Sequence, residues 1–196
     1  VGYQMNCISE KYFSVSELVK HDFKLKEVLK VPTRDRVIPF RVEHITDEKA
    51  YLVATDCVGR VKITDMNEYL DNFMKELPED LLDICGEIEH KVNGQLIRKA
   101  KVTLLSYGNT TGCENCNGAD DMRFDGLRSA ADRCKNDAYW EDTPYYYEDW
   151  DEDFFASNST DFLYVSAFGY SCNNLGASGT GGVCPVIAIK KKTEEI

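Results

Sequence analysis

Apolar residues recur with helical spacing in one segment of the chain. Between residues 65 and 77 they return at intervals of three and four, which places them on one face of a helix. Asp65 is followed by Glu68 at the spacing of a capping box, and Pro78 suits the first turn of a second helix. The pattern therefore predicts a helix over 65–77 and a short one that runs on to Cys85.

Alternating apolar and polar positions predict strands on both sides of these helices. Residues 37–45 alternate well enough for a strand, and Pro39 favours a place at the edge of a sheet. Residues 49–55 follow a short polar turn, so we expect them to complete a hairpin. A further strand is predicted over 60–63, after a glycine turn, and a buried one over 101–105.

Three other segments carry weaker patterns. Serines followed by spaced apolar residues predict one or two short helices before Pro32, and 127–134 is a candidate for another. Residues 87–99 are polar and ambiguous, although Asn93-Gly94 is a turn signal.

The C-terminal part of the chain has a distinct composition. Two apolar runs, 162–165 and 183–189, are predicted as the final strands, and they bracket a stretch of Gly, Ser, Asn, Thr and Ala with single aromatics. Binding loops use such residues, because aromatics give rigid contact area and small polar residues adapt their hydrogen bonds. An acidic and aromatic tract over 137–153 directly precedes this part and holds both tryptophans. We expect the two segments to share one surface.

Length and composition fit one globular domain. The chain has 196 residues, of which 43% are hydrophobic and 29% are charged. We predict a single α+β domain over 1–196, with an N-terminal helical segment over 1–30. A scaffold of strands and helices over 31–136 then precedes a display region over 137–190.

The charge excludes some classes of partner. The net charge is −11, whereas binding to nucleic acid requires a basic footprint. Anionic membrane surfaces are disfavoured for the same reason, and no apolar run approaches the ~20 residues of a membrane-spanning helix. We therefore predict neither nucleic-acid binding nor membrane insertion.

Cysteines and carboxylates raise the question of a metal site. Cys113 and Cys116 form a CxxC pair in a loop rich in Gly and Asn, but zinc requires four ligands and only Cys134 lies nearby in sequence. The acidic tract offers oxygens for calcium without the spacing of an EF-hand. We predict no cofactor and keep zinc at the CxxC pair and calcium at the acidic tract as alternatives.

The residue patterns do not favour an enzyme. No G-x-S-x-G motif is present, and His21, His44 and His90 stand in contexts that suit structural or solvated histidines. The chain has eight cysteines scattered along its length, so we expect mostly reduced thiols. A disulfide framework remains the alternative.

Several motifs carry a family resemblance. The C-terminal motif is Gly182-Val183-Cys184-Pro185 followed by apolar residues, and the other segments concerned are 38–42, 101–106, 116–121, 133–136 and 162–166. They resemble a family of uncharacterised domains from bacteriophages, prophages and bacteria that end in Gly-Val-(Arg/Cys)-Pro. The resemblance implies a C-type-lectin-like fold, similar in shape to formylglycine-generating enzymes and to the variable proteins of diversity-generating retroelements. Many relatives carry a Trp-rich Leu-Arg-Ser motif at 162–166, so the local surface is not carried over.

The leading hypothesis is a non-enzymatic binding protein. The resemblance implies a phage or prophage protein that is made in a bacterial cytoplasm and acts on a virion or at a cell surface. It would recognise a host protein or glycan, with a homo-oligomer compatible with this role and with retroelement diversification of the binding segment left open. The candidate ligand-binding residues are Trp140, Tyr164, Ser166, Phe168, Tyr170, Asn173, Asn174, Ser178 and Thr180.

Two alternatives stay open. One is a structural virion or assembly protein without a small ligand. The other is a cysteine-dependent modifying enzyme on the same fold that uses Cys172 or Cys184, because formylglycine-generating enzymes act through cysteines.

Overall fold

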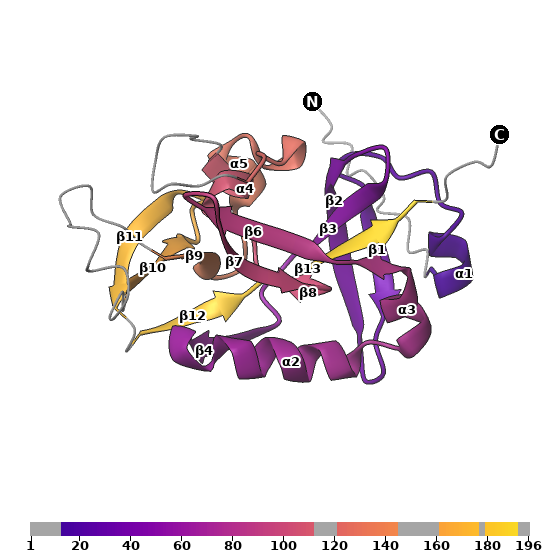
Figure 1. Ribbon diagram of the computed structural model, residues 1–196, viewed down its shortest axis with the longest axis horizontal. Helices are drawn as coiled ribbons and strands as arrows, with labels where there is room; N and C mark the ends of the chain where they lie inside the picture. The colour runs from indigo at the N-terminus through magenta and orange to yellow at the C-terminus, as the bar shows by residue number, and fades with distance from the viewer. Residues whose placement is uncertain (1–12, 112–120, 145–160, 177–178, 192–196) are drawn as a thin grey trace, which may run out of the picture.

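The computed structural model describes residues 13–111, 121–144, 161–176 and 179–191. They form a mixed α+β structure of mostly antiparallel strands with few helices, which confirms the predicted class. Figure 1 shows the strands in two main groups, with one long helix running beneath both. No helix of the described segments is long and apolar enough to cross a membrane.

The first sheet has six strands in the order β1-β2-β3-β13-β5, with β8 also paired to β13. Its strands are β1 (Val28–Pro32), β2 (Val37–Ile45), β3 (Lys49–Ala54), β5 (Cys85–Gly86), β8 (Val102–Thr103) and β13 (Val186–Lys190). All of its pairings are antiparallel. The C-terminal strand β13 therefore lies inside the sheet, beside a strand from the first third of the chain.

The second sheet has five strands in the order β11-β10-β9-β12-β4. Its strands are β4 (Gly59–Lys62), β9 (Tyr139–Pro144), β10 (Asp161–Val165), β11 (Ser171–Gly176) and β12 (Thr180–Val183). The acidic tract and the C-terminal segment meet here, because β9 pairs with both β10 and β12. The predicted strand at 60–63 is confirmed as β4, and its partner is β12.

The helices are short except for one. They are α1 (Val15–Leu18), α2 (Met66–Glu76), α3 (Glu79–Ile84), α4 (Tyr107–Thr111) and α5 (Ala130–Arg133), with single 3-10 turns at Ile63–Asp65 and Asp125–Leu127. The predicted helices at 65–77 and from Pro78 are confirmed as α2 and α3. The expected capping box is not formed, because Asp65 belongs to a 3-10 turn and its side chain makes no cap hydrogen bond.

The hairpin of β2 and β3 is confirmed, but the prediction that Pro39 places its strand at a sheet edge is wrong. Strand β2 lies between β1 and β3 rather than at a sheet edge. Pro39 pairs with Lys30 on one side and accepts the backbone N–H of Thr55 on the other, just past the end of β3. An interior strand tolerates the missing N–H there because the β3 ladder has already ended.

Two further segments differ from the sequence expectations. Residues before Pro32 form α1 but also the strand β1, in which Leu29 and Val31 alternate into the core. The ambiguous polar segment forms the hairpin of β6 (Ile88–Val92) and β7 (Gln95–Ala100). Asn93 and Gly94 turn it with φ of 49° and 75°, the two positive values that a type I′ turn requires.

One hydrophobic cluster joins the two sheets. It includes Leu52 from the first sheet, Trp140 and Val183 from the second, and Leu70 and Phe73 from α2. Two of the connections that cross between the sheets are β3 to β4 and β12 to β13. They run side by side, because Val58 donates its N–H to the carbonyl of Val183 at 2.8 Å.

Candidate recognition surface

The turn between β10 and β11, residues 166–170, projects aromatic side chains from the second sheet. Ser166 donates its N–H to the carbonyl of Tyr170 at 2.8 Å, and Gly169 donates to the carbonyl of Ser166 at 2.8 Å. The Ser166 hydroxyl accepts the N–H of Tyr170 at 3.2 Å. Ser166 therefore shapes the turn through its backbone and its side chain. We call this segment the aromatic turn.

Phe168 and Tyr170 stand on the aromatic turn with most of their surface in solvent. Their exposed fractions are 78% and 62%, the two highest among the large hydrophobic side chains that the structure describes. Contiguous apolar patches that stay exposed to solvent commonly mark contact sites. Both side chains therefore lie at the surface of the protein.

A buried arginine fixes the aromatic turn to the body of the protein. Arg133, at the end of α5, donates from Nε to the carbonyl of Gly169 at 2.8 Å. Its Nη1 donates to the carbonyls of Leu127 at 2.9 Å and Thr110 at 3.3 Å. The guanidinium thus ties the turn to α4 and to the segment before α5. Nothing in the hydrophobic pattern singled Arg133 out, because two of its acceptors, the carbonyls of Thr110 and Gly169, are distant in sequence.

Close packing on α5 also holds the turn. Gly169 has a φ of +80°, and a Cβ built on it would lie 1.8 Å from the carbonyl oxygen of Ala130. Only glycine fits, both for its left-handed backbone and for the contact with α5. The two exposed aromatics therefore stand on a turn whose backbone is fixed at several points.

Trp140 is corrected as a candidate ligand-binding residue. Its side chain is fully buried in the core, and its indole N–H donates to the carbonyl of Val61 at 3.0 Å. The ring meets Tyr164 edge to face at 6.5 Å between centroids, and Tyr164 is itself half-buried. Trp140 holds β9 against β4 and β10 and has no surface left for a ligand.

The other candidate residues lie away from the aromatic turn or outside the described residues. Thr180 is exposed at the start of β12, which Figure 1 places beside the end of β11 remote from α5. Asn173 and Asn174 belong to β11, but the placement of their side chains lies outside the described part, as does Ser178. The structure thus brings Ser166, Phe168 and Tyr170 together on one turn.

The part of the acidic tract that opens β9 is interior, whereas Asp137 before it is partly exposed. Tyr139, Trp140, Glu141 and Asp142 of β9 are all buried. The rest of the tract, from 145 onward, lies outside the described residues, as do Cys113 and Cys116. Within the described ranges no group of three or more His, Cys, Asp or Glu side chains is arranged to hold a metal ion.

A buried carboxyl group lies behind the aromatic turn. The Glu141 side chain is fully buried and accepts a hydrogen bond from the Thr110 hydroxyl. Burial raises the pKa of Glu141 to about 7, against the smaller opposing effects of the Thr110 hydrogen bond and the Arg133 charge. Thr110 also offers its carbonyl to Arg133, so the carboxyl group and the arginine that fixes the turn share a neighbour.

A second buried polar group surrounds His90, which the sequence suggested only as structural or solvated. Its Nδ1 lies 3.0 Å from Asp121 Oδ2, and its Nε2 lies 2.8 Å from the carbonyl of Leu104. Because both partners only accept hydrogen bonds, both ring nitrogens donate and the ring is charged. Burial lowers the pKa of His90, but the hydrogen bond to Asp121 and the charges of Asp142 and Asp121 together raise it above its ordinary value. The ring thus joins β6 to Asp121 and to the backbone at Leu104.

Four cysteines have described side chains, and all four are free thiols: Cys57, Cys85, Cys134 and Cys184. This agrees with the expectation of mostly reduced cysteines for these positions. The side chain of Cys172, one of the two cysteines of the enzyme alternative, lies outside the described part. Cys184, the other, is buried, and burial raises its pKa well above that of an ordinary thiol.

Comparisons with known proteins give no relative from which a role could be transferred to this site. Neither the protein-family models, nor the curated proteins, nor the solved structures include a match to the chain.

Proposed function

We propose that this chain is a non-enzymatic binding protein that recognises a protein or glycan ligand through the aromatic turn. The single observation that carries the proposal is the exposure of Phe168 and Tyr170, 78% and 62%, on a turn held by Arg133. Aromatics in such a setting contribute most of the binding energy in many interfaces.

The fixed backbone of the turn supports this role energetically. A flexible loop loses conformational freedom when it binds, and that loss reduces affinity. The contacts of Gly169 with α5 and Arg133 order the turn before any ligand arrives. Tyrosine and phenylalanine add large contact areas with few rotatable bonds.

The wider setting follows the family resemblance. We infer a C-type-lectin-like scaffold in a phage or prophage protein that acts on a virion or at a cell surface. The mixed α+β class with short antiparallel strands supports this at a coarse level. Diversification by a retroelement would act on residues of the C-terminal strands and on the aromatic turn between them.

The test is a binding screen with a matched control. The purified chain is screened against host cell-surface extracts and a glycan array, beside the double variant Phe168→Ala/Tyr170→Ala. The control is Leu96→Ala/Ile97→Ala on the β6–β7 hairpin, where exposed fractions of 52% and 36% allow a similar loss of apolar area. We expect the turn variant to lose at least about 30-fold in affinity and the control to bind as the parent does.

Folding is checked for all three proteins by far-UV circular dichroism and thermal unfolding. Folded parent protein that binds nothing in either screen contradicts the proposal. So does equal binding by the turn variant.

The same turn also fits the alternative role of an assembly protein. In that case the aromatic turn would contact a second copy of the chain, and sedimentation velocity would show an oligomer that the turn variant abolishes. A monomeric parent at micromolar concentration would count against it. The buried position of Cys184 and its raised pKa give the enzyme alternative little support from that residue.

A further inference from the structure

Two cysteines far apart in sequence face each other where the sheets connect. Cys57 lies in the connection from β3 to β4, and Cys184 directly follows β12. Their sulfur atoms are 3.0 Å apart. A disulfide bond measures about 2.0 Å, so bonding requires only a small approach.

The backbone on both sides of this pair is fixed. Cys57 donates its N–H to Asn136 Oδ1 at 2.9 Å. On one side of Cys57, Ala54 donates to the carbonyl of Pro185 at 3.0 Å, and on the other Val58 donates to that of Val183 at 2.8 Å. The two connections are thus held together, and the sulfur atoms stay within reach of each other.

The two thiols have different environments. Cys57 is half-buried and within reach of solvent, whereas Cys184 is only 1% exposed. The hydrogen bond with Cys184 is the main cause that lowers the pKa of Cys57, and the Lys135 ammonium acts in the same direction. Burial raises the pKa of Cys184. An accessible thiol that ionises readily beside a buried one suits a first-reacting and a resolving cysteine.

We propose that Cys57 and Cys184 form a reversible dithiol–disulfide site that exchanges with low-molecular-weight disulfides. Cys57 reacts first, and Cys184 then closes the protein disulfide. This site is independent of ligand binding by the aromatic turn.

The exchange balances with glutathione disulfide as the oxidant. The Cys57 thiolate attacks one sulfur of glutathione disulfide, its S–S bond breaks, and one glutathione thiolate leaves. Cys184, losing its proton, attacks the Cys57 sulfur and displaces the second glutathione. The two protein thiols are oxidised to a disulfide, and glutathione disulfide is reduced to two thiols that take up the two protons.

The disulfide would link the β3–β4 connection to the β12–β13 connection and close most of the chain into one covalent loop. A loop of this length strongly restricts the unfolded chain, so the oxidised protein is the more stable form. We expect its Tm to exceed that of the reduced protein by roughly 5–10 °C.

The test equilibrates the full chain with a series of reduced and oxidised glutathione mixtures. Remaining thiols are alkylated, and peptide mass spectrometry locates every disulfide. We expect a Cys57–Cys184 peptide pair that disappears with dithiothreitol, together with the rise in Tm. Recovery of both cysteines as alkylated thiols at the most oxidising ratio overturns the proposal, as does pairing of either with another cysteine.

Two variants test the order of the steps. Cys184→Ala removes the resolving thiol, so Cys57 should accumulate as a mixed disulfide with glutathione. Cys57→Ala should leave Cys184 unmodified, because it is buried. Modification of Cys184 in the folded Cys57→Ala protein would contradict the assigned order. The location of disulfides by mass spectrometry in the unsubstituted protein tests the proposal even if either variant fails to fold.

Discussion

At the scale of single residues, the buried Glu141 carboxyl group is the most consequential position. Burial raises its pKa to about 7, because no solvent reaches the charged form. The folded protein therefore binds this proton more tightly than the unfolded chain does between about pH 4.5 and pH 7. The contribution of Glu141 to the free energy of unfolding is therefore fully present below pH 4.5 and is lost as the pH rises through 7.

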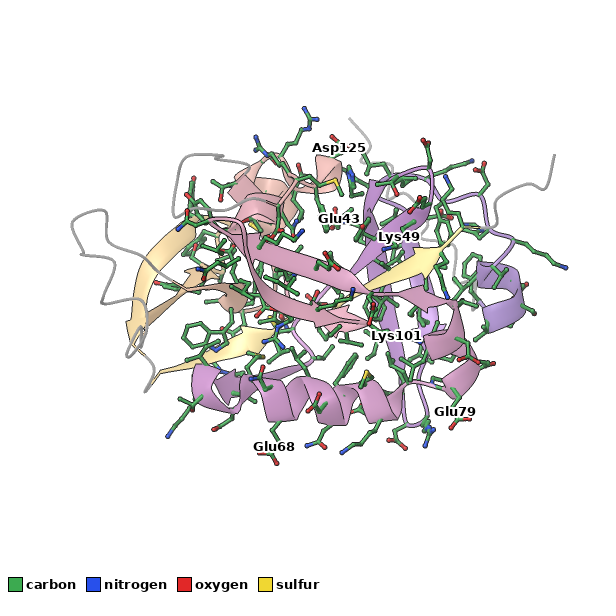
Figure 2. The ribbon with its side chains drawn as sticks, viewed as in Figure 1. Glu43, Lys49, Glu68, Glu79, Lys101 and Asp125 are labelled. Atoms are coloured by element: carbon green, nitrogen blue, oxygen red, sulfur yellow. The ribbon has the colours of Figure 1, made fainter. Side chains whose placement is uncertain are left out.

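Glu141→Gln should remove this pH dependence. Glutamine keeps the shape of the protonated acid and does not ionise. The parent should lose free energy of unfolding as the pH rises, and the variant should not. We therefore expect the difference between variant and parent to shift by about 3 kcal/mol in favour of the variant from pH 4.5 to pH 8. Urea unfolding at pH 4.5, 6 and 8 measures it. The control is Glu68→Gln, because the exposed Glu68 side chain points away from the protein on α2 in Figure 2. The same pH-dependent shift in the control would refute the assignment of the effect to Glu141.

Sequence patterns predicted some of these residues and missed others. Phe168 and Tyr170 became candidates because they stand among small polar residues, although the sequence did not decide between surface and packing for them. Trp140 and Glu141 were misplaced because the tract around them is mostly acidic, and acidic residues usually mark surface. Burying a carboxyl group in β9 depends on Thr110 and Arg133, and the sequence gives no sign that these residues meet.

At the scale of elements, the aromatic turn depends on its contact with α5. Gly169 combines a left-handed backbone with close packing on Ala130, whereas Gly94 has a φ of +75° and nothing within 4 Å of the place that a Cβ would take. Alanine substitutions at the two positions therefore distinguish the cost of a left-handed backbone, which both share, from the cost of a steric clash, which only Gly169 has. Both belong to tight turns between antiparallel strands.

Gly169→Ala should destabilise the protein more than Gly94→Ala. A left-handed alanine alone costs about 1 kcal/mol, which is the loss expected at Gly94. The clash with Ala130 adds to it at Gly169, for a total of roughly 2–4 kcal/mol. Chemical denaturation of both variants measures the difference. Equal losses would mean that the turn is not held against α5.

Elements with a clear period were predicted and those without one were not. The hairpin of β2 and β3 and the helix α2 have long, regular patterns. Strand β1 is too short for its alternation to be told from a helical pattern. Strand β6 was ambiguous because His90, a polar residue, occupies an inward position between Ile88 and Val92. Its charge is balanced by Asp121, which is distant in sequence.

At the scale of the whole molecule, hydrophobic clusters span the two sheets. Trp140, Leu52 and Leu70 belong to a single cluster although they come from different sheets and from α2. Loss of either sheet would expose the side chains of the other. We therefore expect the described segments to unfold as one cooperative unit.

A single tryptophan reports on this cooperativity. In a Trp150→Phe background, Trp140 fluorescence follows the core between the sheets, and far-UV circular dichroism follows all secondary structure. Under reducing conditions the two urea transitions should coincide in midpoint and slope. An earlier fluorescence transition would show that the sheets separate before they unfold.

The place of β13 inside the first sheet has a consequence for synthesis on the ribosome. Strands β1, β2 and β3 emerge before β13, so the edge of β3 finds its native partner only when β13 has been translated. Throughout that interval the nascent chain carries an open, apolar sheet edge that other chains can pair with. The first sheet is therefore completed only after the residues between β3 and β13 have been made, and we expect the yield of folded protein to depend on how well that edge is protected in the interval.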